Sequence, residues 1–155
     1  MKKTNKGFSL VELIIVIAIM AILAAALAPA LIRYIDKSRR SSDLSNAGVL
    51  QSAAQTAAAD ESAYAEIAGA ASTADAIVLE ATEDTAWTVP ASVTSGTKFK
   101  DEFTATAGTK APKIKLKKGT SGATKWEITL TKEGGFKVSI SGTELVPSAQ
   151  GPWAN

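Results

Sequence analysis

The pattern of apolar and polar positions changes its period along this chain. From Leu13 to Ile32 no residue is charged and almost all are apolar. Further on, apolar residues recur at spacings of three and four, which predicts one face of an amphipathic helix as far as about residue 60. In the last third they alternate with polar residues, which predicts half-buried strands. The chain is therefore expected to be an α+β protein that begins with a long helix.

The helical spacing is carried mainly by small residues, with a break between Ser38 and Asp43. The positions that follow it are Ile32, Ile35, Leu44, Ala47, Leu50, Ala54, Ala57 and Ala58. Because alanine buries little area, we expect this part of the helix to be stabilised by a sheet that covers it.

Three late segments alternate clearly, namely residues 113–117, 126–131 and 136–141. They predict an antiparallel meander with one apolar face, and Gly134-Gly135 suits a hairpin because glycine accepts a positive φ. The alanine-rich stripe is the available cover for that face. Between the long helix and these segments we expect one or two short helices over 62–81, with a start signal at Ser72-Thr73 and Asp75, and a strand at 87–89. Residues 93–108 are expected to be irregular and anchored by Phe99 and Phe103. The C-terminal residues 145–147 and 152–153 are expected to pack against the sheet edge.

Glu12 lies at the beginning of the uncharged run, which is long enough to cross a bilayer. A charged residue at mid-membrane costs about 2.5–3.5 kcal/mol, less near a helix end, so such a residue is a functional-site hypothesis whose partner must be named. The partner we expect is an amino group, produced by cutting the chain between Gly7 and Phe8.

Two conventional interpretations of the segment compete with this one. A secretory signal would need a small-residue cleavage site, and Ala26-Leu27-Ala28 offers one, but Pro29 would directly follow the cut. A plain single-pass anchor fits the length. That interpretation leaves Glu12 and the Gly7-Phe8 junction unexplained.

The run Gly7-Phe8-Ser9-Leu10-Val11-Glu12, after a short basic leader, closely resembles the class III signal of type IV pilins and pseudopilins. The resemblance covers roughly residues 1–60 and includes a proline, Pro29, well along the apolar segment. It implies that a prepilin peptidase cuts after Gly7 and N-methylates Phe8. It also implies a pilin-like fold, in which a long N-terminal helix packs on a small antiparallel sheet.

By this resemblance the chain is a filament subunit, with residues 1–7 as leader, 8–32 as transmembrane and filament-core helix, 33–60 as its amphipathic continuation and 61–155 as globular head. The expected partners are membrane lipid, the prepilin peptidase, the pilus assembly machinery and identical subunits in a helical homopolymer. The expected locations are the cytoplasmic membrane before assembly and the extracellular pilus afterwards. A pseudopilin of a type II secretion or competence apparatus shares every N-terminal feature and remains the alternative.

Glu12 lies one helical turn after Phe8, so it can face the amine of its own chain or of a neighbour. A subunit docked one turn out of place would leave both charges unpaired, so the pair is better suited to setting register than to adding affinity. Pro29 cannot donate to the Ala25 carbonyl, which predicts either a modest kink or a point that unwinds in the filament.

The chain has no cysteine and no histidine, which excludes disulfides, thiol nucleophiles, zinc fingers and the usual general base. We therefore expect no enzyme activity and no cofactor. Scattered late acids make a calcium site unlikely, which favours a pilus over a secretion pseudopilus. Many Gram-negative pilins close a C-terminal loop with a disulfide, so by the same resemblance the absence of cysteine favours a Gram-positive source.

Charge is unevenly spread, because residues 60–84 carry seven acids and no base, whereas residues 110–137 carry eight lysines and two glutamates. These blocks are interpreted as two solvated faces, as complementary surfaces of neighbouring copies, or as a lysine face that contacts DNA. In the last case the chain would be a membrane-tethered binding module. Salt-sensitive DNA binding that is lost on replacing Lys113, Lys115 and Lys117 would support it.

Overall fold

A computed structural model describes residues 8–72, 74–93, 95–116, 125–150 and 153–154. The chain divides into two compact units, residues 1–38 and 39–155. The first helix, α1 (Leu10–Ala57), belongs to both units. In the second unit it is followed by α2 (Glu61–Ala68), the 3₁₀ turn η1 (Gly69–Ala71), β1 (Ala76–Thr82), α3 (Thr97–Ala107), β2 (Lys125–Leu130), β3 (Phe136–Ile140) and β4 (Thr143–Val146).

The four strands form one antiparallel sheet in the order β1-β2-β3-β4. The β2–β3 pairing sets Trp126 opposite Ile140, Ile128 opposite Val138 and Leu130 opposite Phe136, so the apolar positions of both strands share one face. Gly134, in the connection between them, has φ +85°, which glycine adopts without strain. The predicted α+β fold and the β2–β3 hairpin are confirmed.

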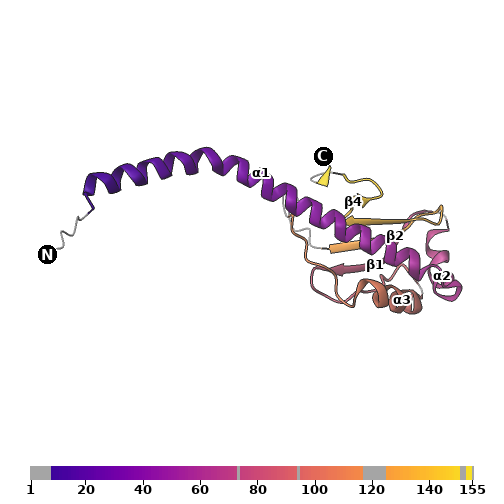
Figure 1. Ribbon diagram of the computed structural model, residues 1–155. Helices are drawn as coiled ribbons and strands as arrows, with labels where there is room; N and C mark the ends of the chain where they lie inside the picture. Colours follow the sequence, from indigo (N-terminus) through magenta and orange to yellow (C-terminus); the bar gives the residue numbers. More distant parts are fainter. Residues whose placement is uncertain (1–7, 73, 94, 117–124, 151–152, 155) are drawn as a thin grey trace, which may run out of the picture. The chain divides into compact units, whose positions relative to one another are not determined.

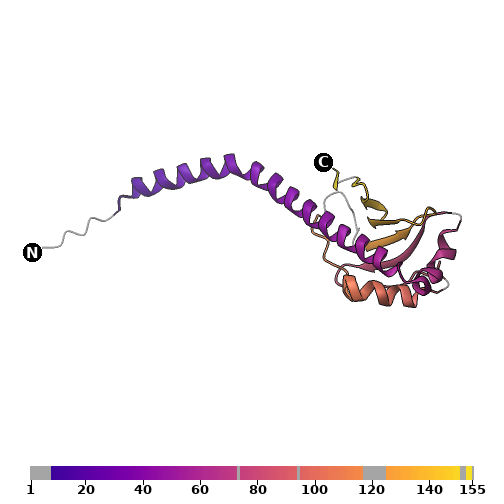
Figure 2. The ribbon, with the colours of Figure 1, turned by 45° about the vertical axis from the view of Figure 1, so that its right-hand side comes forward.

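The part of α1 within the second unit lies across the apolar face of the sheet, as Figure 1 shows, and α3 lies on the β1 side (Figures 1 and 2). Ala47, Leu50, Ala53, Ala54 and Ala57 are buried in the same core cluster as the inward-facing strand residues. The expected cover of the sheet by the alanine-rich stripe is confirmed.

Aromatic side chains fill the space between α3 and the sheet. Phe99 and Phe103 are fully buried, and Phe99 stacks on Phe136 with ring centroids 5.7 Å apart. Trp87 contacts Phe103 edge to face at 4.9 Å. The two phenylalanines are anchors as predicted, but the expected irregular chain over 93–108 is wrong, because residues 97–107 form α3. Its first turn is capped from a distance by Glu66, whose carboxylate accepts the Lys98 N–H at 2.8 Å.

Three other predictions of secondary structure are wrong. Residues 76–82 form β1 rather than a helix, and the supposed helix start at Ser72 and Asp75 precedes this strand. Residues 87–89 make only an isolated bridge between Thr88 and Glu80. The alternating segment 113–117 is not a strand where it is described, up to Leu116, although Ile114 and Leu116 are buried as its pattern predicted.

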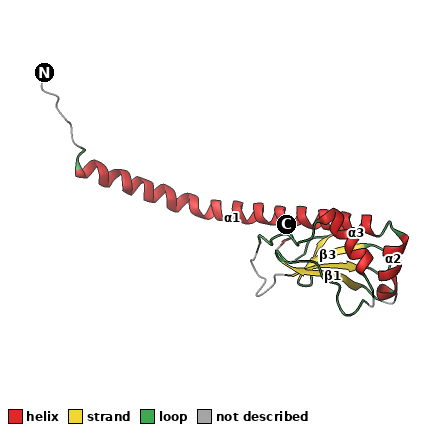
Figure 3. Ribbon diagram, turned by 90° about the horizontal axis from the view of Figure 1, so that it is seen from below, coloured by secondary structure: helices red, strands yellow, loops and turns green. Residues whose placement is uncertain are grey.

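The chain ends also differ from expectation at two points. Residues 145–147 do not simply pack against the sheet edge, because β4 is itself the edge strand, paired with β3. Trp153 is fully buried, and Pro152 lies outside the described residues. Seen from below in Figure 3, the sheet lies against the red helices of the second unit.

Candidate functional site

The first turn of α1 brings the Glu12 carboxylate back to its own backbone. The Ser9 N–H donates to Glu12 Oε2 at 2.9 Å, and the Leu13 N–H donates to the Ser9 carbonyl at 3.2 Å. A serine followed three residues later by a glutamate is the capping-box sequence, in which the glutamate satisfies a backbone N–H that the helix itself leaves unpaired. The negative charge is also favourable at this end of the helix dipole.

The site residues predicted from the sequence are Gly7, Phe8, Glu12 and Pro29, and the structure describes three of them. Phe8 is described and exposed over 79% of its surface, and the hydrogen bond that the structure gives Glu12 goes to Ser9. Gly7 lies outside the described residues. Pro29 lies inside α1, and the chain is helical on both sides of it.

Beyond the first turn, α1 presents apolar side chains on all sides. The exposed large apolar residues of its first half are Leu10, Val11, Leu13, Ile14, Ile15, Val16, Ile17, Ile19, Met20, Ile22, Leu23, Leu27, Leu31 and Ile32. Among the described residues, α1 is the one helix long and apolar enough to cross a membrane; its most apolar window has a mean hydropathy of 3.0 and is not buried within the chain. A helix that is apolar all round must be buried by lipid or by other protein.

The second unit pairs charges of the acidic and basic blocks with each other. Lys125 of β2 forms an ion pair with Glu80 of β1, and its Nζ lies 3.5 Å from Glu127 Oε1. The hydrogen bond to Glu80 raises the pKa of Lys125. Glu127 is itself almost buried and accepts hydrogen bonds from Ser139 Oγ at 3.2 Å and from the Gly142 N–H at 2.7 Å.

A second ion-pair group is centred on Lys137 of β3. Lys137 Nζ is 3.1 Å from Asp75 Oδ2 and 3.9 Å from Glu144 Oε2. The hydrogen bond from the Lys132 backbone N–H is the main cause that lowers the pKa of Asp75, and the hydrogen bond from the Lys137 ammonium lowers it further. The same hydrogen bond with Asp75 raises the pKa of Lys137. Pairing within one chain therefore accounts for these charges, because the fold brings Lys125 beside Glu80 and Lys137 beside Asp75, and they do not require a neighbouring copy.

Of the three lysines proposed to contact DNA, the structure describes two. Lys113 and Lys115 are exposed, and Lys113 Nζ lies 3.8 Å from Asp84 Oδ2. Lys117 lies outside the described residues. DNA contact stays an untested prediction.

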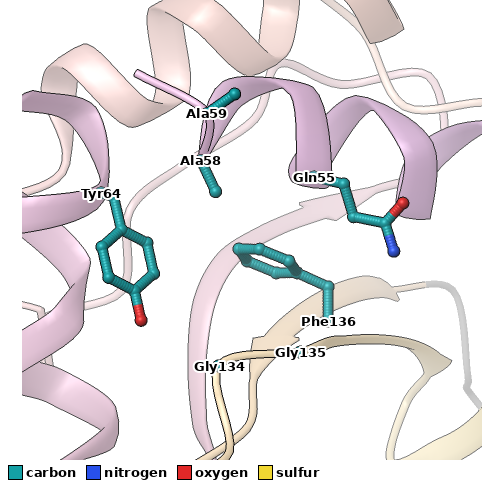
Figure 4. Close-up of a pocket in the computed structure, with 7 residues that line it drawn as sticks. All are labelled: Gln55, Ala58, Ala59, Tyr64, Gly134, Gly135 and Phe136. Carbon is teal, nitrogen blue, oxygen red and sulfur yellow. The ribbon is translucent and has the colours of Figure 1, made fainter. Parts of the chain in front are cut away.

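A cavity of about 290 Å³ opens between the end of α1, α2 and the β2–β3 hairpin. Figure 4 shows the rings of Tyr64 and Phe136 on either side of it, with Ala58 above and Gly134 and Gly135 below. Its remaining lining residues are Gln55 and Ala59. Its lining includes one titratable side chain, the Tyr64 phenol, and no carboxylate or amine beside it, so the cavity lacks the paired nucleophile and base of a catalytic site. Among the described residues no group of three or more acids could hold a metal ion.

Asp43 was not singled out from the sequence, where it lies at the end of the break in the apolar pattern. In the structure Asp43 is fully buried and accepts three hydrogen bonds. Its position carries a signal, because Asp43 lies four residues before Ala47 and seven before Leu50, on the buried face of α1.

Taken together, the fold and the first turn of α1 define a class, namely single-helix membrane-anchored proteins with an α+β head whose anchor begins with a capped glutamate. The comparisons with known proteins agree with this class. Residues 2–28 match the family described as the prokaryotic N-terminal methylation motif.

The chain is also similar to type IV major fimbrial proteins FimA of Dichelobacter nodosus. The identity is 43% over 60 residues, which are 39% of this chain and 38% of each relative. The chain therefore matches well under half the length of these curated relatives. No solved structure is significantly similar to it. The matches support a type IV pilin.

Proposed function

We propose that this chain is the structural subunit of a type IV pilus, held in the membrane by α1 and then assembled into a filament through the same helix. The observation that carries the proposal is the first half of α1, an exposed, all-apolar helix with one carboxylate in its first turn. The methylation motif and the similarity to major fimbrial proteins support it.

Processing would convert the first turn of α1 into the assembly site. Cleavage by a prepilin peptidase after Gly7 turns the Phe8 peptide nitrogen into an amine, and methylation of that amine keeps it basic. Glu12 then has a second possible partner besides the Ser9 N–H. We propose that, on docking, the Phe8 ammonium of one subunit and the Glu12 carboxylate of the next face each other.

The magnitudes favour a role in register over a role in affinity. Two unit charges 4 Å apart at an effective dielectric of 20 attract by about 4 kcal/mol. Desolvation removes much of that gain, whereas an unpaired charge among apolar helices remains strongly unfavourable. Most of the association free energy then comes from van der Waals packing of α1 against sister helices, because lipid is as apolar as the helix and supplies no hydrophobic driving force. The charge pair selects where each new subunit stops.

The finer features of location and partners form part of the same proposal. The subunit resides in the cytoplasmic membrane and then in an extracellular helical homopolymer, with assembly machinery acting on it in between. A Gram-positive source is supported by the absence of cysteine from the chain.

Replacement of Glu12 tests the proposal. Glu12→Gln keeps an acceptor for the Ser9 N–H and removes the charge, whereas Glu12→Ala removes both. Both variants are expected to reach the membrane in normal amounts and to yield at least about tenfold fewer sheared filaments, since the loss of roughly 1.4 kcal/mol per docking step is a factor of ten. The matched control is Glu61→Gln, an exposed acid in the first turn of α2. Filaments at the normal yield from Glu12→Gln would show that the charge does not set the register.

A further inference from the structure

Asp43 is the most deeply buried charged residue of the described chain, and it connects three segments of the second unit. Its Oδ1 accepts the Lys115 N–H at 2.9 Å, and its Oδ2 accepts the Leu116 N–H at 2.8 Å. The same Oδ2 accepts the indole N–H of Trp153 at 3.2 Å, from 110 residues further along the chain. A buried carboxylate with three donors is fully satisfied, as burial of a charge requires.

The C-terminal segment depends on few other polar contacts. The Gln150 N–H donates to the Glu144 carbonyl of β4 at 2.9 Å, and Ser148 Oγ donates to the Glu144 carboxylate at 3.1 Å. The Trp153 N–H donates to the Gln150 carbonyl at a longer 3.3 Å, and the Trp153 side chain is fully buried. The indole is therefore the anchor of the described part of this segment.

We propose that Asp43 is a two-sided latch, a single carboxylate on α1 that holds the C-terminal segment through Trp153 and, independently, the chain before residue 117 through two backbone N–H groups. With no cysteine in the chain, no disulfide can make this closure. A hydrogen-bonded latch differs from a disulfide because it opens reversibly. Opening of the C-terminal side alone would uncover the outer edge of β4, where the Glu144 carbonyl is now bonded to Gln150.

Amide hydrogen exchange of the full chain in detergent micelles can test both sides of the latch separately. The Lys115 and Leu116 amides report one side, and the Gln150 and Trp153 amides report the other. Trp153→Phe keeps an aromatic ring but removes the indole N–H together with part of a fully buried ring system. It is expected to speed exchange of the Gln150 amide about tenfold or more, because a hydrogen bond to a charged group is lost, and to leave Leu116 unchanged.

Asp43→Ala is expected to speed exchange on both sides. The Asp43→Ala, Trp153→Phe double variant should speed exchange at Gln150 by clearly less than the product of the two single effects, because both single variants remove the same hydrogen bond. The matched control is Asp101→Ala, which removes an exposed acid of α3; it should change neither side. If Asp43→Ala does not fold, Trp153→Phe alone decides. Unchanged exchange at Gln150 in Trp153→Phe, or equal acceleration at Gln150 and Leu116, would overturn the latch.

Discussion

Enlarging a buried alanine of α1 tests whether the small-residue stripe is the surface on which the sheet packs. Ala54 is fully buried within the core cluster, and Ser52, two residues earlier on the same helix, is exposed. Leucine and alanine have similar helix propensities, so Ala54→Leu perturbs the packing and not the helix. Ser52→Leu adds the same side chain where there is room for it.

The expected size of the effect follows from the packing. A protein core is close-packed, and extra methyl and methylene groups in it cost about 1–3 kcal/mol through displaced side chains and backbone. An exposed substitution stays within about 0.5 kcal/mol. For a unit of this size, 1 kcal/mol corresponds to roughly 4 °C in the melting temperature, so Ala54→Leu should melt about 4–12 °C below the unmodified chain.

Near-UV circular dichroism of the full chain in detergent micelles is a suitable assay, because all three tryptophans lie in the second unit and are buried. Ser52→Leu is expected to melt within about 2 °C of the unmodified chain. Equal melting temperatures for Ala54→Leu and Ser52→Leu would refute the close packing of the stripe against the sheet.

The remaining predictions concern pH, backbone conformation and the apolar helix. The pKa of Asp75 is lowered in the folded chain, so the ionised carboxylate stabilises the fold. This stabilisation is complete above the unfolded pKa of about 3.9 and is lost as the pH falls through the folded pKa. Asp75→Asn should therefore make the urea midpoint of unfolding less sensitive to pH in the acid range. Gly134→Ala should lower the free energy of unfolding by about 1 kcal/mol, because Gly134 has φ +85°, whereas Gly48→Ala in α1, where an added Cβ meets nothing within 4 Å, should raise it by about 0.5–1 kcal/mol in the same urea titrations. Pro29→Ala restores an N–H to the helix interior, so a filament reconstruction should show continuous helix around residue 29 in the variant and unwound chain there in the unmodified protein, and continuous helix in both would contradict the unwinding hypothesis.

The features that the sequence predicted correctly depend on local periodicity. The sequences of β2 and β3 alternate strictly, and the short connection between them contains two glycines, so their pairing could be predicted without the rest of the fold. The buried face of α1 followed from its three- and four-residue spacing. Both signals lie within one element, where side-chain direction follows directly from backbone geometry.

The failures arise where contacts distant in sequence decide the local structure. α3 is weakly apolar and begins at a glycine that makes no side-chain cap; its cap comes from Glu66, about 30 residues earlier. The segment before residue 117 alternates like a strand, yet its backbone N–H groups are bonded to Glu83 and Asp43 instead of to a neighbouring strand. In both places a carboxylate distant in sequence accepts hydrogen bonds from backbone N–H groups, and no local pattern predicts such a contact.

The residues of the candidate site also divide into those that a local pattern predicts and those that depend on contacts distant in sequence. Glu12 could be singled out from sequence because a lone acid beside a long apolar run is rare. Its hydrogen bond to Ser9 was implicit in the Ser-x-x-Glu spacing of a capping box, although the sequence analysis had considered only an amine as partner. Asp43 could not be assigned its role, because its donors lie more than 70 residues away.

The most direct test of the filament proposal is the mass of the N-terminal peptide from material sheared off cells that express this chain. The account predicts long fibres whose subunits begin at Phe8 and carry one added methyl group on its amine. Subunits that begin at any other residue, or that occur outside the cell only as single molecules, would contradict it.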